Sequence, residues 1–282
     1  MLSTYFAVIC ERVDYIRALA DRFPDTSLAD RWGLLCHGGD LSMSMLLAAY
    51  SRGIFPWFNP DDPLLWWTPD PRCVILPEEY HMPRRSARAL RALPLRITMD
   101  RAFSQVLNGC SNREKTWLSQ DMKDAYLALH RAGFAHSVEA WLDGELVGGL
   151  YGLALGRAFY GESMFHTVSE ASRACLAALC ALLVLRGVTL LDCQQETAHI
   201  MAQGGSLLPR DLFERELESA LTFDFDEDDA LTREYADMPL EREHAWPFLP
   251  WRTRYEHADG LWRPLPEGRR PAPAHRVVVQ KG

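Results

Sequence analysis

The sequence has no long hydrophobic run. Although 48% of its 282 residues are hydrophobic, no stretch approaches the ~20 consecutive apolar residues that span a bilayer, so we expect no membrane partner. The opening MLSTYFAVIC lacks a basic start and is followed by Glu11 and Arg12, unlike a secretory signal. We therefore expect a cytoplasmic protein, with a chain long enough for two domains.

Paired metal ligands are also missing. The seven cysteines are odd in number and include no Cys-x-x-Cys pair, and the nine histidines show no ligand spacing. This pattern is typical of reduced thiols, and it argues against a disulfide framework or a zinc site. We expect no bound metal.

An overall positive charge is absent, since the net charge is −8, but basic residues are concentrated in one segment. Phosphate contacts depend on such local surfaces more than on the total charge. The segment is either a solvated helix face or a surface that contacts a polyanion. Its members are Arg84, Arg85, Arg88, Arg91, Arg96 and Arg101, opposed by Asp100.

The stretch from residue 135 to residue 194 predicts the central unit of the fold. Turn pairs at Asp143-Gly144 and Gly156-Arg157 separate extended runs, which indicates an antiparallel meander. Helical spacing of leucines then predicts a helix from Ala171 to Arg186, begun at Ser169 and Glu170 and ended at Gly187. The run VTLLDC predicts a buried strand, parallel to the last strand of the meander. The order is β-β-β-α-β.

Polar side chains lie where these strands are expected to end. Asp192 and Gln194 are two residues apart, so they point to one face, and Glu162 ends the preceding strand. Ligands gather at the carboxyl ends of neighbouring strands in such sheets. These residues either form a site, or Asp192 caps a loop and Glu162 pairs with an arginine.

The chain divides into three parts. We expect residues 1–70 to form a small N-terminal domain with an aromatic FPWF loop, 71–222 an α+β domain, and 223–282 an acidic linker with a Pro- and Trp-rich extension. The proline-rich loop predicts no regular element; in it Trp57 is placed to stack on a nucleobase, while Trp66 and Trp67 are assigned to the core. Helices are predicted at 1–22, 41–51, 83–93, 103–108, 119–132 and within 199–221, and strands at 74–76 and 96–99.

The β-β-β-α-β order is similar to the core of the Gcn5-related acetyltransferase fold. That fold brings a coenzyme A pyrophosphate close to the backbone with glycines between the fourth strand and its helix. The corresponding segment here reads HTVSEASR, without a glycine. We therefore expect no acetyl-CoA and no other cofactor.

Over roughly residues 23–221 the sequence closely resembles leucyl/phenylalanyl-tRNA protein transferases. The motifs that carry the resemblance are GLLCHGGDLS, AAYSRGIFPWF, LLWWTPDPR, TWLSQDM, ELVGGLYG, GESMF and LLDCQ. It implies an acetyltransferase-like fold that binds aminoacyl-tRNA. It also implies that Leu or Phe, with Met as a further candidate, moves to the N-terminal Arg or Lys of acceptor proteins, which marks them for N-end rule degradation. We expect the chain to act as a monomer.

By this resemblance, Asp192 orients Gln194, which accepts from the attacking amine, and Glu162 holds an ammonium or the acceptor's cationic side chain. Trp57 and Trp117 flank the terminal adenosine, and Arg84 and Arg88 contact acceptor-stem phosphates. The apolar pocket for the donor side chain falls on Leu150, Phe159, Leu179, Leu183 and Leu191.

Two departures from the family pattern lie beside this expected site. His166-Thr167 replaces the usual Ser-Arg pair, and IMAQGG after His199 replaces a Ser-Leu-Gly turn. They keep open a catalytically altered relative that only binds tRNA or peptide. A related transferase with another acceptor, such as a cell-wall precursor, is a further alternative, although the duplicated domain expected of it is not visible.

Overall fold

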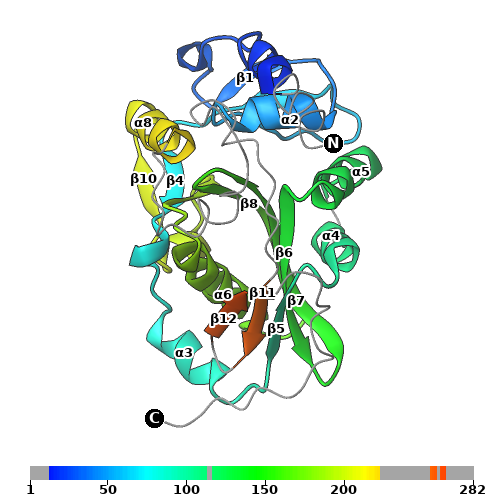
Figure 1. The fold of residues 1–282 in the computed structure, drawn as a ribbon, viewed down its shortest axis with the longest axis vertical. Coiled ribbons are helices and arrows are strands. Elements are labelled where there is room, and N and C mark those ends of the chain that lie inside the picture. The colour runs from blue at the N-terminus through cyan, green and yellow to red at the C-terminus, as the bar shows by residue number, and fades with distance from the viewer. Residues whose placement is uncertain (1–12, 113–115, 223–254, 259–260, 265–282) are drawn as a thin grey trace, which may run out of the picture.

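The computed structural model describes residues 13–112, 116–222, 255–258 and 261–264. Its centre is a seven-stranded mixed sheet in the order β10-β4-β9-β8-β7-β6-β5 (Figure 1). The strands are β4 (Arg72–Ile75), β5 (Arg96–Met99), β6 (Ala135–Leu142), β7 (Glu145–Leu155), β8 (Ala158–His166), β9 (Leu190–Gln194) and β10 (Ser206–Leu208).

The predicted β-β-β-α-β unit is confirmed. β6, β7 and β8 form an antiparallel meander, and β9 runs parallel to β8 after the crossover helix α6 (Ala171–Leu185). The meander turns at Asp143-Gly144, where both residues have a positive φ, as a tight two-residue hairpin requires. Gly187, with φ 71°, ends α6 as expected.

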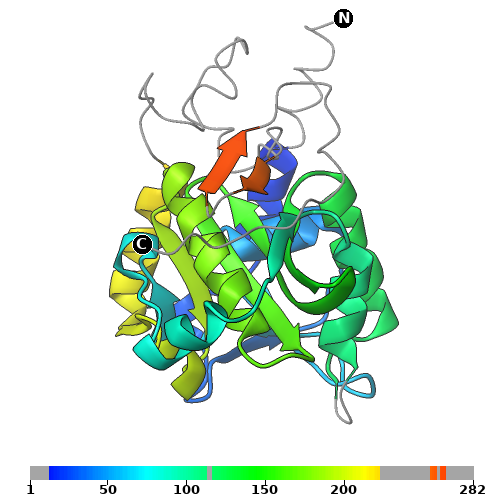
Figure 2. The same ribbon diagram turned by 90° about the horizontal axis from the view of Figure 1, so that it is seen from below.

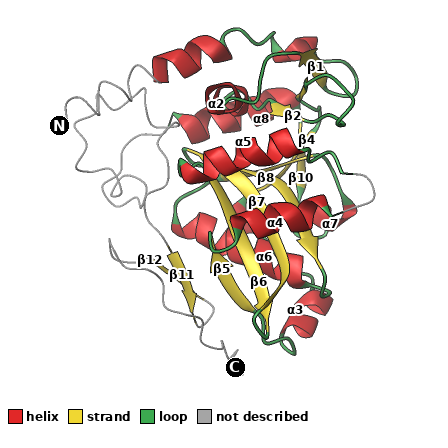
Figure 3. Ribbon diagram, turned by 90° about the vertical axis from the view of Figure 1, so that its right-hand side faces the viewer, coloured by secondary structure: helices red, strands yellow, loops and turns green. Residues whose placement is uncertain are grey.

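Helices cover both faces of this sheet. α4 (Phe103–Ser111) and α5 (Gln120–Arg131) lie across one face, and α6 covers the other (Figure 3). Alternation along β7 separates the two cores, since Tyr151 and Leu153 belong to one apolar cluster while Leu150 and Ala154 belong to the other. α3 (Arg84–Leu90), α7 (Ala198–Met201) and α8 (Arg210–Leu221) flank the sheet with two short 3-10 helices, η1 (Thr26–Leu28) and η2 (Pro77–Glu79).

The N-terminal part contains regular structure that the sequence did not predict. Its aromatic segment supplies two strands of a three-stranded antiparallel sheet in the order β1-β3-β2, above the larger sheet in Figure 1. The strands are β1 (Leu34–His37), β2 (Phe55–Pro56) and β3 (Leu65–Trp67), next to α2 (Met43–Tyr50) and a helix at 13–20. The prediction of an irregular loop was wrong because strands of two to four residues are too short to show alternation.

A small hairpin from the C-terminal extension lies against the body. β11 (Tyr255–Ala258) contacts β5, and β12 (Leu261–Pro264) contacts α6 (Figure 2). Tyr255 is buried and its Oη accepts a hydrogen bond from Arg186 Nη1 at 2.9 Å. The expectation that part of this extension docks is confirmed for these residues, while the acidic run and Trp246, Phe248 and Trp251 lie outside the described residues.

Candidate functional site

A cavity of about 670 Å³ opens where β8 and β9 end. α6 closes one side of it with Leu176 and Leu179, and the segment at α7 closes another with Thr197, His199 and Ile200. Most of its floor is apolar, and its polar end carries Glu162. The other lining residues are Gly109, Asn112, Leu150, Tyr151, Gly161, Ser163, Met164, Phe165, His166, Thr167, Ser172, Leu191, Cys193 and Gln195.

Glu162 is held by two buried phenols. Tyr50 Oη donates to its Oε1 at 2.6 Å and Tyr126 Oη to its Oε2 at 2.7 Å, and the two phenol oxygens are 2.6 Å apart. Burial raises the pKa of Glu162 to about 7, although hydrogen bonds from the tyrosines oppose the rise. A carboxyl that titrates near neutral pH at a cavity wall is a frequent feature of active sites.

Gln194 connects the end of β9 to this carboxyl. Its Nε2 donates to Glu162 Oε1 at 3.1 Å. Its backbone has φ 64°, an uncommon left-handed conformation for a residue other than glycine. Its N–H donates to Asp192 Oδ1 at 2.8 Å, which fixes that conformation. Backbone geometry of this kind is often found at functional sites.

Asp192 is fully buried and belongs to an ion pair in the core. Arg72 donates to it through Nε at 2.8 Å and Nη2 at 2.7 Å, the bidentate geometry that binds a carboxylate best. Asp192 reaches Gln194 through the Gln194 backbone N–H, while Arg72 takes up the remaining part of the carboxylate. Asp192 therefore positions the Gln194 backbone.

The predicted pocket residues divide into two groups. Leu150, Leu179 and Leu191 line the cavity together with Glu162. Phe159 and Leu183 are fully buried in the same apolar cluster but are not among the lining residues. They support the pocket wall from behind.

The residues assigned to tRNA contact lie outside this lining in the described part of the chain. Trp57 is 40% exposed and packs edge-on against Trp67, with ring centroids 5.4 Å apart. Trp117 is half-buried before α5, and Arg84 and Arg88 are exposed on α3. These side chains are available to a partner.

Sequence reasoning missed three residues that organise the site. Tyr50 and Tyr126 occupy the apolar stripes of their helices, and Arg72 follows the aromatic segment. A tyrosine on a buried helix face needs a partner for its hydroxyl, and a fully buried arginine needs a counter-ion. Those requirements were the available signals, but sequence spacing does not show which carboxyl satisfies them.

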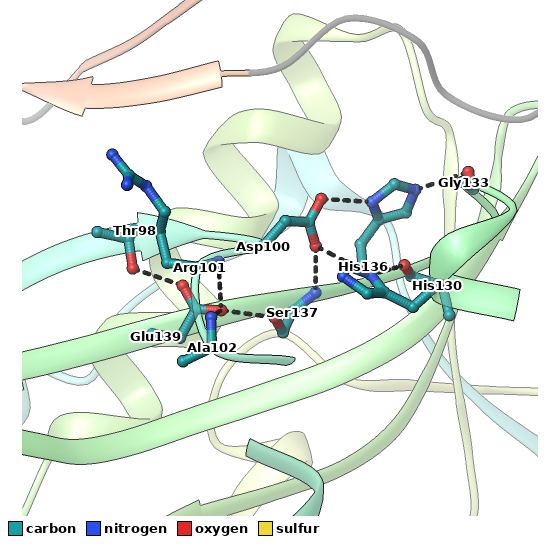
Figure 4. A network of polar contacts seen from close by, with 10 residues as sticks. Thr98, Asp100, Arg101, Ala102, His130, Gly133, His136, Ser137 and Glu139 are labelled. Carbon is teal, nitrogen blue, oxygen red and sulfur yellow. Dashed lines mark hydrogen bonds and ion pairs between the residues drawn. The ribbon is translucent and has the colours of Figure 1, made fainter. Parts of the chain in front are cut away.

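A second buried polar network lies at the junction of β5 and β6 (Figure 4). Glu139 accepts from Thr98 Oγ1, Ser137 Oγ and the N–H groups of Arg101 and Ala102. Burial raises its pKa to about 7 despite these bonds. None of these residues lines the cavity, so this network stabilises the sheet.

Asp100 belongs to the same network and turns the chain between β5 and α4. It accepts from Ser137 N and pairs with His136 Nδ1 at 2.8 Å. Burial acts to raise the pKa of Asp100, but the charge of His136 and the bond from it bring that pKa below its usual value.

Metal ions and membranes have no matching feature in the described residues. No group of three His, Cys, Asp or Glu in them is arranged to hold a metal ion. Within the same part of the chain, no helix has the length and apolar character to cross a membrane.

An apolar cavity that ends at a buried carboxyl with a raised pKa is typical of an enzyme site for a small apolar group. Gln194 donates to that carboxyl but is not among the lining residues. The family models agree on which enzyme class this is. Residues 74–218 match the model described as leucyl/phenylalanyl-tRNA protein transferase, and residues 39–70 match the model of its N-terminal domain. The chain belongs to the leucyl/phenylalanyl-tRNA protein transferase family.

Curated relatives carry the same name. The chain is 46% identical to the leucyl/phenylalanyl-tRNA protein transferase of Methylococcus capsulatus, over 80% of this chain and 92% of the relative. It is 49% identical to that of Desulforapulum autotrophicum, over 72% and 92%. Among solved structures, a GCN5-related N-acetyltransferase from Kribbella flavida has a TM-score of 0.28 at 11% identity, covering 57% of this chain and 59% of that one, a similarity too low for a fold assignment.

Proposed function

We propose that this enzyme moves Leu or Phe from aminoacyl-tRNA to the N-terminal Arg or Lys of acceptor proteins, with Met as a further donor, and so marks them for N-end rule degradation in the cytoplasm. The observation that carries the proposal is the leucine-lined cavity that ends at Glu162. An aliphatic or aromatic side chain fits such a slot, and its ester then lies beside Glu162 and Gln194.

The reaction needs placement more than strong acid or base. The donor is an ester and the product an amide, so the transfer is downhill, and an α-amine with a pKa of ~7.7–8.0 is already partly neutral. Because Gln194 Nε2 donates to Glu162, its Oε1 would be the atom that accepts from the attacking amine. Arg72 and Asp192 hold this arrangement from the core.

The polynucleotide is proposed to contact the exposed residues outside the cavity. Trp57 and Trp117 would stack on or flank the terminal adenosine, and base–aromatic stacking contributes ~1–3 kcal/mol per base. Arg84 and Arg88 would meet acceptor-stem phosphates. The acetyltransferase-like fold and the division at residues 70 and 222 belong to the same proposal, supported by the order of β6, β7, β8, α6 and β9.

The experiment is incubation with charged Leu-, Phe- and Met-tRNA and peptides that begin with Arg, Lys, Asp or Glu. Transfer of Leu or Phe to Arg and Lys peptides supports the proposal. Transfer to acidic termini alone would assign another acceptor. Binding without transfer would instead identify a catalytically altered relative, which is the alternative that the His166-Thr167 pair raises.

A further inference from the structure

The contacts among Tyr50, Tyr126 and Glu162 form a closed ring. The three oxygen pairs are separated by 2.6 Å for Tyr50 and Tyr126, 2.6 Å for Tyr50 and Glu162 Oε1, and 2.7 Å for Tyr126 and Glu162 Oε2. Both tyrosines are fully buried. Oxygen atoms at these separations are hydrogen-bonded, and each such bond requires a proton between the two atoms.

The number of protons in the ring shows whether Glu162 is ionised. Each phenol carries one proton, so the two tyrosines supply two of the three that the ring needs. An ionised Glu162 accepts only, which would leave one pair of oxygens facing each other with lone pairs alone. The third proton is therefore on Glu162. In that neutral state the carboxyl donates to one phenol, this phenol donates to the other, and the second phenol donates back to the carboxyl, in place of the two phenol-to-carboxylate bonds of the ionised state.

The surroundings of Glu162 agree with this count. Gln194 faces it from β9 and donates a hydrogen bond without bringing a charge. Asp192, also on β9, is the nearby anion, and its charge raises the pKa of Glu162, as burial does to a greater extent. Arg72 on β4, the cation behind Asp192, donates two hydrogen bonds to Asp192 itself. Among the described residues no ion pair reaches Glu162.

We infer that Glu162 is a neutral carboxylic acid within this ring and supplies the proton for the departing oxygen of the donor ester. This inference rests on the proposed transfer reaction. It replaces the expectation that Glu162 holds an ammonium, because a neutral carboxyl cannot form that ion pair. Tyr50 and Tyr126 are positioning residues, since they act through Glu162.

The proton balance closes in one cycle. The acceptor nitrogen forms its bond to the ester carbon, and the bond from that carbon to the ribose oxygen breaks. The departing oxygen takes the Glu162 proton and becomes a hydroxyl. The nitrogen releases its surplus proton, which returns to Glu162 and restores the ring. No other co-reactant is needed.

Infrared spectroscopy of the full chain, labelled with ¹³C-glutamate, tests the protonation directly. Glu139 has a pKa near the same value, so Glu139→Gln serves as the matched control and background. In that background we expect a carboxylic-acid band at pH 6 that fades as the pH rises through about 7 and is absent from Glu139→Gln/Glu162→Gln. A band unchanged by Glu162→Gln would overturn the inference.

Kinetics separate the proton role from a structural one. Tyr126→Phe removes a donor to the ionised carboxylate, so the pKa of Glu162 should rise. The alkaline fall of kcat in Leu transfer to an Arg-initiated peptide should then move to higher pH. Loss of kcat at every pH with an unmoved limb contradicts the inference. If the wild type transfers nothing, the proposed function fails, while the infrared result still decides the state of Glu162.

Discussion

Arg72 and Asp192 form a buried bidentate ion pair that joins three parts of the molecule. The Arg72 guanidinium lies 4.9 Å from the ring centroid of Phe55 in the N-terminal sheet and 4.6 Å from that of Phe213 in α8. Asp192 in turn accepts from the Gln194 N–H. One ion pair thus connects the small sheet, α8 and the polar end of the cavity.

Replacing Arg72 tests this connection. Arg72→Met leaves the Asp192 carboxylate buried without a counter-ion, and we expect a loss of roughly 3–5 kcal/mol in the free energy of unfolding, measured with urea. The matched control is Arg215→Met, which breaks an exposed pair with Asp211 and should change stability by less than about 1 kcal/mol. Equal effects of the two substitutions would show that the buried pair is not a stability determinant. Asp192→Ala likewise leaves the Arg72 guanidinium buried without a counter-ion. A loss of transfer in that variant would therefore combine an effect on folding with an effect on catalysis.

The buried Glu139 carboxyl is expected to make the free energy of unfolding depend on pH. A carboxyl whose pKa is raised in the fold stabilises it below the unfolded value and loses that contribution as the pH rises through the folded value. The change from 4.5 to about 7 for Glu139 corresponds to roughly 3 kcal/mol. Urea unfolding between pH 4.5 and 8 should show a decline that is smaller by about this amount in Glu139→Gln. The decline due to Glu162 remains in that variant. Parallel curves for the two proteins would refute the assignment.

Leu179 is expected to influence which donor amino acid, Leu or Phe, the enzyme prefers. It lines the cavity, so Leu179→Ala enlarges the slot and should shift the preference from Leu toward Phe by about 1–3 kcal/mol, roughly 10- to 200-fold in the ratio of kcat/KM. The matched comparison is Leu183→Ala, buried in the same cluster behind the lining. That variant should lose stability without changing the ratio. A shift of equal size would place position 183 in the pocket.

The exposed arginines predict a salt dependence. Changing Arg84 and Arg88 to Gln removes two proposed phosphate contacts, which should weaken tRNA binding and lower the slope of log K against log salt by roughly one to two. The variant should fold normally because both side chains are exposed. Nitrocellulose filter binding at several salt concentrations measures the slope, and Arg215→Gln is a control for the loss of a surface charge. An unchanged slope removes these arginines from the interface.

Residues 135–194 show how much of the fold was predictable. Each strand of the meander is longer than five residues, and turn residues with positive φ separate them, so local sequence carried the pattern. β2, β3 and β10 have two or three residues and form only because a partner strand is present. Pairing between distant segments, such as β10 with β4, leaves no local signal.

The carboxyl and the apolar lining of the site were predictable, but the buried residues that hold them in place were not. Gln194 was indicated by its place at the end of β9, whereas the prediction that Glu162 ends its strand was wrong, since it lies in the middle of β8 (Ala158–His166). The structure still brings the two side chains to 3.1 Å. The prediction did not include Tyr50 and Tyr126, because their helices join Glu162 through packing that no spacing reveals. The prediction did not include Arg72 for the same reason, since it reaches Asp192 from another strand.

The central claim is that an esterified amino acid meets a peptide amine at Gln194 and Glu162. It is tested most directly by single-turnover transfer of Leu from Leu-tRNA to a peptide with N-terminal Arg. The wild type is compared with Gln194→Ala after urea unfolding has shown that the two proteins have the same midpoint. We predict transfer slower by about 100-fold or more, the scale found when one positioned polar group is removed from an active site. Equal rates in the two proteins would contradict the account.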